Sequence, residues 1–185
     1  MIDLRGYNEV SESSGSYQQL PAGGYVCRIV NVELGERNNR PQIRVAIDIA
    51  EGEYAGHFAK QNRDKWSNSA IFTRYIYDEN EKFITPALKS LLANVERSND
   101  NFTADLQNNL RRFDQNTLVG KLCGFTFGER EYEYNERIYT TTEVKFPTAV
   151  SKIRSGDFEV PPLQRLEAAY PPPSKNDIDF SDIPF

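Results

Sequence analysis

Basic and aromatic side chains lie close together in several stretches of this sequence, and side chains of these two kinds can bind a single nucleic-acid strand. Arginine and lysine pair with phosphates, and aromatic rings stack on bases. The densest such stretch runs from Lys60 to Trp66. We expect the nucleic-acid contacts to come from fourteen residues: Arg28, Arg37, Arg40, Arg44, Lys60, Arg63, Lys65, Trp66, Arg74, Tyr75, Tyr77, Arg137, Tyr139 and Lys145.

Each of these residues also has a structural interpretation, which the sequence leaves open. Trp66 could close the end of a barrel, and Tyr75 and Tyr77 could belong to the core. Arg28 and Arg44 could pair with Glu33 or Asp48 instead of phosphate. We expect the nearby Tyr132 and Tyr134 to pack across strands, because glutamates at 129, 131 and 133 alternate with them and would repel phosphate.

The end of the chain carries a second chemical signal. Phe185 combines an aromatic ring with the terminal carboxylate, and Pro184 stiffens the backbone before it. Residues 170–174 include three consecutive prolines, which form a semi-rigid spacer. The expected partner-binding residues are Asp177, Asp179, Phe180, Asp182, Ile183, Pro184 and Phe185.

These last nine residues resemble the C-terminal peptide of bacterial single-stranded DNA-binding proteins, which is acidic and ends in Ile-Pro-Phe. The resemblance implies that the tail recruits replication, recombination and repair proteins. It covers the tail alone, so the rest of the chain has to be interpreted from its own residues. An ordinary solvated acidic terminus is the alternative.

Composition limits the kinds of protein that this chain could be. It has 185 residues and a net charge of −5, and residues 25–150 hold 17 basic and 18 acidic side chains. A nucleic-acid site must therefore depend on local arrangement rather than bulk charge. No apolar run is long enough for a membrane span, and the first residues lack a signal peptide, so we expect a protein of the bacterial cytoplasm with no membrane contact.

Nothing in the sequence indicates catalysis, a cofactor or a metal site. Cys27 and Cys123 lie in apolar stretches, which is typical of reduced core cysteines. His57 is the only histidine, and acidic residues at 64, 78, 79 and 81 lie in polar loops where they could in principle hold magnesium. No Walker A loop or Gly-x-Ser-x-Gly motif is present. We therefore expect a protein that is not an enzyme.

The elements that must position these residues follow from hydrophobic periodicity. Residues 25–34 and 43–49 read as a hairpin of strands, and a third extended segment begins at 57–60, is interrupted at 61–68 and resumes at 70–77. Thr85-Pro86 starts a helix with apolar residues at helical spacing, and a second helical stripe runs from Phe102 to Phe113. Strands return at 118–134 and 138–146, the latter with Ile138, Thr140, Thr142, Val144 and Phe146 on one face.

This order predicts a mainly β protein. Three strands, a helical insert and two strands match the five-stranded antiparallel Greek-key barrel known as the OB-fold, here with two helices between strands three and four. We expect a flexible N-terminal arm at 1–20, the barrel at 21–150 with its insert at about 83–115, an extension at 151–170 and a disordered acidic tail at 171–185. No long helix is expected at 151–166, because two prolines follow at 161 and 162.

The body also resembles a family of bacteriophage early proteins, some of which are described as single-strand DNA-binding proteins. The similar segments are residues 24–29, the turn at 52–56 and residues 119–124. These segments are mostly turn glycines, so the resemblance bears on the fold more than on function. Together with the tail, it favours a non-enzymatic protein that coats single-stranded DNA without strong sequence preference. The carboxylates of the tail could compete with DNA for the basic face in a salt-dependent way, so that binding of DNA frees the tail for partners. The alternative is an adaptor that captures host enzymes with its tail and binds DNA weakly. The sequence leaves a homodimer open.

Overall fold

The computed structural model describes residues 19–61, 70–103 and 113–166, and its architecture is mainly β. Five antiparallel strands form one open sheet in the order β3-β2-β1-β4-β5. The strands are β1 (Gly23–Arg37), β2 (Arg40–Ile49), β3 (Ala70–Tyr75), β4 (Leu122–Tyr134) and β5 (Arg137–Thr148). Two α-helices, α1 (Pro86–Arg97) and α2 (Val150–Ser155), and two short 3-10 helices, η1 (Ala59–Gln61) and η2 (Gln115–Leu118), complete the elements.

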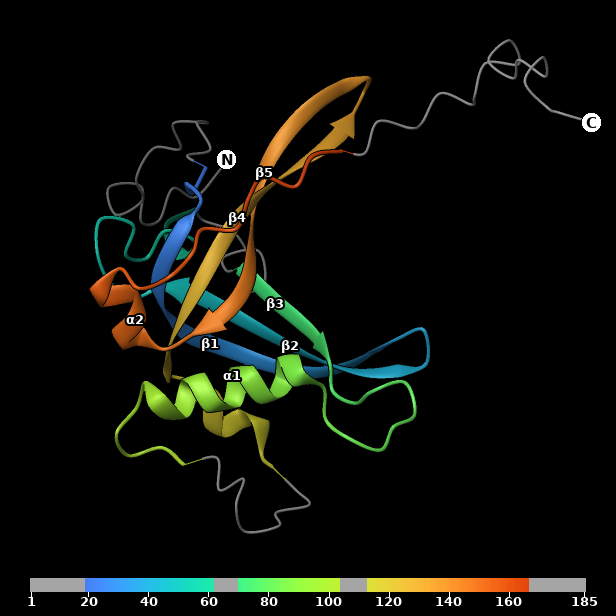
Figure 1. Ribbon diagram of the computed structural model, residues 1–185, viewed down its shortest axis with the longest axis vertical. Helices are drawn as coiled ribbons and strands as arrows, with labels where there is room; N and C mark the ends of the chain where they lie inside the picture. The colour runs from blue at the N-terminus through green and yellow to red at the C-terminus, as the bar shows by residue number, and fades with distance from the viewer. Residues whose placement is uncertain (1–18, 62–69, 104–112, 167–185) are drawn as a thin grey trace, which may run out of the picture.

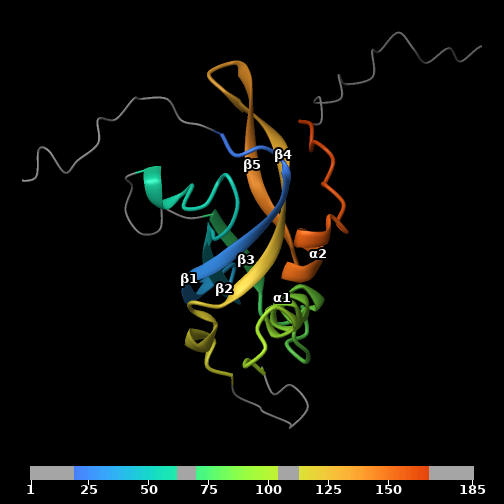
Figure 2. The ribbon, with the colours of Figure 1, turned by 90° about the vertical axis from the view of Figure 1, so that its left-hand side faces the viewer.

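The core lies on one face of this sheet. Alternate residues of β2, namely Ile43, Val45, Ile47 and Ile49, are buried, as the period of two predicts. Helix α1 lies across one end of the sheet, whereas the hairpin of β4 and β5 projects beyond the other end (Figures 1 and 2). The helix buries Leu88, Leu91, Leu92 and Val95.

The start of α1 agrees with the sequence prediction. Thr85 is the N-cap, its hydroxyl oxygen accepts from the Leu88 amide at 3.3 Å, and Pro86 occupies the first turn. The same hydroxyl donates to the carbonyl of Tyr75 at 2.6 Å. The cap therefore also fixes the helix to the end of β3.

Two predicted strand segments are wrong, and both fold locally instead. At 57–60 the chain forms turns and η1, because the amide of Phe58 donates to the Asp48 carboxylate at 3.0 Å and that of Lys60 donates back to Gly56. The predicted strand start at 118–121 is instead the last residue of η2 followed by a turn, and η2 is capped by Asp114, whose carboxylate accepts from the backbone N–H of Asn116. Strand β4 begins only at Leu122, after the turn that contains Gly120.

Two further predictions need adjustment, and a third lies mostly outside the described residues. Leu20, predicted to lie in the N-terminal arm, is buried in the core. The predicted second helical stripe falls mostly on 104–112, outside the described residues, although Phe102 and Phe113 pack against the core. In β5 a bulge at Lys145 places Phe146 opposite Thr126, on the other face from Val144, and leaves it 62% exposed.

The segment after α2, residues 156–166, lies along β4, and we call it the C-terminal strap. Phe158 and Ile153 cover Gly24, Ile153 also covers Gly124, and Pro161 covers Gly128. Each of these glycines would bring a Cβ atom within 2.9 Å of the covering side chain. The backbone of the strap then hydrogen-bonds to the edge of β4. The backbone N–H of Gln164 donates to the carbonyl of Glu129, and the backbone N–H of Glu131 donates to the backbone carbonyl of Gln164, both at 2.9 Å. No long helix forms here, as predicted.

Candidate nucleic-acid interface

An arginine and a tyrosine stack on the outer face of β1, β2 and β3, the face turned away from the core. The guanidinium carbon of Arg40 lies 4.0 Å from the centroid of the Tyr75 ring, and its Nη2 donates to the Tyr77 carbonyl at 3.3 Å. Tyr75 lies across from the buried Gln42 and is itself half-buried. This pair offers a cation and an aromatic face at one point.

The β1–β2 hairpin brings the pair to its position. Asn38 and Asn39 form its two-residue turn, with φ angles of 52° and 59°. Asparagine tolerates these left-handed values, and such a turn follows the twist of the strands. It sets Arg37 directly across from Arg40. Arg37 and Arg40 therefore flank the turn of this hairpin, and Tyr77, whose carbonyl accepts from Arg40, is 41% exposed.

Arg44 shares this outer face but has an acidic neighbour. Its Nη1 lies 3.8 Å from an oxygen of Glu33, directly across on β1, and both side chains are 43% exposed. An exposed pair at this distance contributes little, about 0–1 kcal/mol.

Arg28 lies near the opposite end of the outer face from Arg40. It opposes Asp48 on β2 and donates to the Gly120 carbonyl at 3.1 Å. Its exposed side chain can contribute charge there, but it does not join the Arg40–Tyr75 pair.

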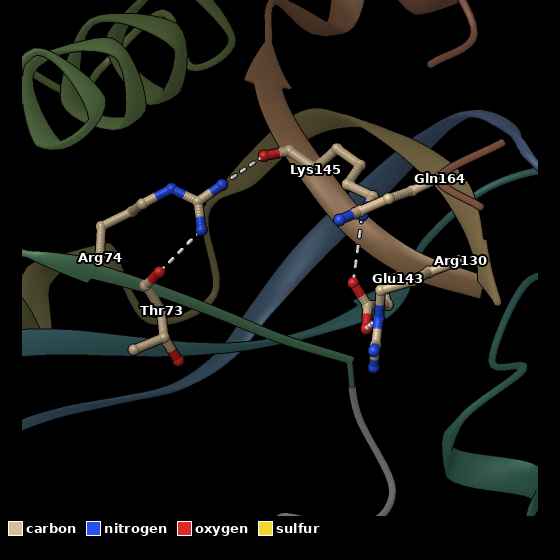
Figure 3. Close-up of polar contacts among 6 residues, drawn as sticks. All are labelled: Thr73, Arg74, Arg130, Glu143, Lys145 and Gln164. Atoms are coloured by element: carbon tan, nitrogen blue, oxygen red, sulfur yellow. Dashed lines mark hydrogen bonds and ion pairs between the residues drawn. The ribbon is translucent and has the colours of Figure 1, made fainter. Parts of the chain in front are cut away.

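Arg74 and Lys145 have structural partners (Figure 3). Arg74 lies on the inner face, 4.2 Å from the Phe72 ring centroid, and it donates to the Thr73 carbonyl at 2.7 Å and the Lys145 carbonyl at 2.6 Å. Burial lowers the pKa of its guanidinium. These bonds link the edge strands β3 and β5, so we do not include Arg74 in the candidate interface.

The ammonium group of Lys145 is occupied as well. It lies 3.1 Å from an oxygen of Glu143 and 3.3 Å from the amide oxygen of Gln164 in the strap. The other oxygen of Glu143 accepts from Arg130 at 2.5 Å. Burial alone would raise the pKa of Glu143, but hydrogen bonds from Arg130 and Lys145 lower it below its usual value. The side chain of Lys145 is only 18% exposed, so we do not include Lys145 in the candidate interface either.

The tyrosines of the β4–β5 hairpin form a separate surface. Tyr139 stacks on Tyr132 across the strands, with ring centroids 5.7 Å apart and planes at 27°, as the cross-strand interpretation of Tyr132 predicts. Arg137 lies across from Tyr134 next to the turn. The glutamates at 129, 131, 133 and 136 outnumber the arginines at 130 and 137, so this hairpin is a poor surface for phosphates.

The remaining predicted residues lie mostly outside the described part of the chain. Arg63, Lys65 and Trp66 fall in 62–69, and the predicted tail residues fall in 167–185. Lys60 is exposed, and its Nζ donates to the Ala55 carbonyl at 2.7 Å. The described chain ends at Leu166, whose amide donates to the Glu131 carboxylate at 3.1 Å.

The strap was not predicted from the sequence, in which residues 151–170 had no assigned role. The available signal was the row of glycines at 24, 124 and 128, because glycine inside a strand indicates close approach of another segment. The bonds of Gln164 fix the point from which the tail continues: the edge of β4 beside the acidic hairpin.

The described residues hold no group of three or more histidine, cysteine or acidic side chains placed to bind a metal ion. His57 is buried, its ring packs edge-on against Phe58 with centroids 5.0 Å apart, and burial lowers its pKa, which favours the neutral form. In the part of the chain that the structure describes, no helix has the length and apolar character needed to cross a membrane.

Comparison with known proteins adds no family. No protein-family model matches this sequence, and no curated protein matches it.

Proposed function

We propose that the sheet is an OB-fold barrel. The spatial order of the strands supports this assignment. Across the sheet β4 lies next to β1, β1 next to β2, and β2 next to β3, which is the strand order of a Greek key. Helix α1 falls between β3 and β4 in the chain, as in the OB-fold, and the bond from Arg74 to Lys145 joins the two edge strands that barrel closure would bring together.

We propose that the protein binds single-stranded DNA on the outer face of β1, β2 and β3. The observation behind this proposal is the stack of Arg40 on Tyr75, with Arg37 and Arg44 on the same strands. Strands two and three and the neighbouring loops are where OB-folds bind oligonucleotides. Ring stacking and phosphate pairing need no particular base, so the protein would coat single strands without strong sequence preference during replication and recombination.

We propose that the tail recruits partner enzymes. The resemblance of residues 177–185 to the bacterial C-terminal peptide supports this role. The strap leads the chain to the edge of β4, at the acidic hairpin. Like charges repel, so the tail would avoid the hairpin and remain available to partners or to the basic face.

An adaptor with little affinity for DNA is the second candidate. The pairing of Arg44 with Glu33, and the near balance of charge in residues 25–150, favour it. In this case the tail would capture enzymes and the sheet would act as a scaffold.

The deciding experiment is a salt titration of fluorescence anisotropy with labelled oligo-dT and duplex DNA, using the full chain, a version ending at Pro173, and point variants. We expect selective binding to the single strand. Tyr75→Ala should weaken it about 5- to 150-fold, the equivalent of about 1–3 kcal/mol of lost stacking. Tyr75→Phe keeps the ring and should bind nearly as the parent does.

Arg40→Gln tests the electrostatic half of the same site. It should reduce the slope of log affinity against log salt by about 0.7, the value for one phosphate contact on a single strand. Arg97→Gln, on the exposed last turn of α1, is the matched control. Absence of binding at low salt would favour the adaptor, and unchanged binding by Tyr75→Ala would refute this site. Tighter binding after removal of the tail would support its competition with DNA.

A further inference from the structure

The outer edge of β5 is a free strand edge among the described residues. Strand β5 lies at the end of the sheet and pairs only with β4 there. Its far half is protected, because the bulge at Lys145, the bond from Arg74 to the Lys145 carbonyl, and Pro147 all interrupt edge pairing. Residues 138–142 have none of these features. They read Ile-Tyr-Thr-Thr-Thr, an uncharged run rich in β-branched residues that suits strand pairing.

The register shows which backbone groups face this edge. On β4, the Glu129 carbonyl and the Glu131 amide bond to Gln164, so these two residues point away from β5. Their neighbours, including Arg130, must then bond to β5, and Arg130 lies across from Thr141. On β5 the amide and carbonyl groups of residues 138, 140 and 142 therefore point outward.

We propose that two copies of this chain pair through these edges, with β5 antiparallel to β5 and the two-fold axis at Thr140. In this register Thr140 faces its own copy and exchanges both hydrogen bonds with it, Ile138 faces Thr142, and Tyr139 faces Thr141. Arg137 falls opposite Glu143, whose two oxygens already accept from Arg130 and Lys145 of the same chain. Opposite residues share a face, so this places a positive and a negative side chain together twice per dimer.

Other registers lose that match. Moving the axis to Thr141 sets Arg137 opposite Lys145, and moving it to Tyr139 sets Arg137 opposite the uncharged Thr141. The outward direction of residues 138, 140 and 142 agrees with the Thr140 axis, which needs a hydrogen-bonded pair at its centre. The edge is thus self-complementary in both backbone direction and charge.

The shape of the hairpin supports pairing. Beyond Glu131, where the pairing of the strap with β4 ends, β4 and β5 continue as a two-stranded ribbon on which Tyr134 and Ile138 are 63% and 65% exposed. A two-stranded ribbon is marginal in water, and a third or fourth strand stabilises it. Pairing of two ribbons makes one four-stranded sheet. The inference does not depend on DNA binding, because the Arg40–Tyr75 pair lies on other strands.

Sedimentation equilibrium of the full chain tests the proposal. We expect a concentration-dependent dimer. Thr140→Pro removes an outward amide that β4 does not use, and it should raise the dimer dissociation constant about tenfold or more, whereas Thr140→Val keeps the amide and should leave it unchanged. Arg137→Glu should also weaken the dimer, and Arg137→Lys should not. A wild-type chain that stays monomeric, or a dimer that both Thr140→Pro and Arg137→Glu leave intact, would overturn the proposal.

Cross-linking gives an independent readout that does not rely on weakening the dimer. Opposed residues of a hydrogen-bonded pair have Cα atoms about 5.5 Å apart, within the range that a disulfide spans. Thr140→Cys should therefore form a covalent dimer when diamide oxidises the two thiols. The native Cys27 and Cys123 are buried and do not interfere. Ser151→Cys, exposed on α2, is the control and should cross-link far less. Equal cross-linking by both variants would contradict the assigned edge.

Discussion

Docking of α2 and the strap on the sheet depends on the absence of side chains at three glycines, and Gly124 is the sharpest place to test it. A Cβ atom at Gly124 would lie 2.7 Å from Cγ1 of Ile153 and 3.0 Å from the carbonyl oxygen and Cγ2 of Thr148. The backbone oxygen cannot rotate away, so either α2 or β5 must move. We therefore expect Gly124→Ala to lower stability, even though alanine is the smallest possible change.

The size of the effect follows from overpacking in a closed core. Such changes cost about 1–3 kcal/mol. For a body of this size this corresponds to a fall in Tm of about 3–12 °C. Gly35→Ala is the matched control, because its Cβ would meet only Cδ of Arg44, at 3.9 Å, and its backbone does not need a left-handed angle. It should change the unfolding free energy by no more than about 0.5 kcal/mol.

Urea unfolding of the two variants, followed by circular dichroism, measures this difference. Ile153→Ala in the Gly124→Ala background should recover part of the loss, with a coupling energy of about 0.5–3 kcal/mol, because it removes one of the two contacts. If Gly124→Ala unfolds at the same urea concentration as the parent chain, α2 does not pack on β4 as described. Additive effects of Gly124→Ala and Ile153→Ala would refute the contact between them.

Two further predictions concern the inner face and the core. Arg74→Met removes the hydrogen bond between β3 and β5 and should lower the unfolding free energy by about 1–3 kcal/mol. The control Arg97→Met, on α1, should change it by less than about 0.5 kcal/mol. Equal effects of the two changes in urea unfolding would argue against this role for Arg74. Burial raises the pKa of Cys123 from 9.0 to about 12, so the unfolded chain releases this proton first. The unfolding free energy should therefore fall as pH rises from about 9 to 12, by up to about 1.4 kcal/mol per pH unit for this thiol. Cys123→Ala should make this dependence of the unfolding free energy on pH less steep, and an unchanged dependence would contradict this cause.

Elements that depend on neighbouring residues could be predicted from the sequence. The alternation of Ile43, Val45, Ile47 and Ile49 predicts a half-buried strand, and the structure buries all four residues. Thr85-Pro86 predicts the start of α1, because capping needs only the next few amides. The β1–β2 hairpin follows from two adjacent strand patterns and a polar turn. Composition and charge, likewise, already place any nucleic-acid site on a local surface.

The site itself depended on contacts between distant segments. Arg40 and Arg74 look alike in sequence, yet Arg40 stacks on Tyr75 at the outer face and Arg74 donates to β5 from the inner face. Only the register of β3 against β2, and the approach of β5 to β3, separates them. The bulge at Lys145 has the same origin, because an extra residue in one strand becomes visible only against its partner.

By itself, the sequence determined the alternation of β2, the start of α1 and the acidic tail ending in Ile-Pro-Phe, because these depend on residues close together in the chain. The tertiary structure decided which cations face solvent, where the strap binds and which strand edge stays open among the described residues. Those outcomes depend on pairing between residues many positions apart, such as Arg74 with Lys145 and Glu129 with Gln164. The pattern of one strand limits which of its faces is buried, but its register against a distant strand also depends on the pattern of that strand and on the turns between them.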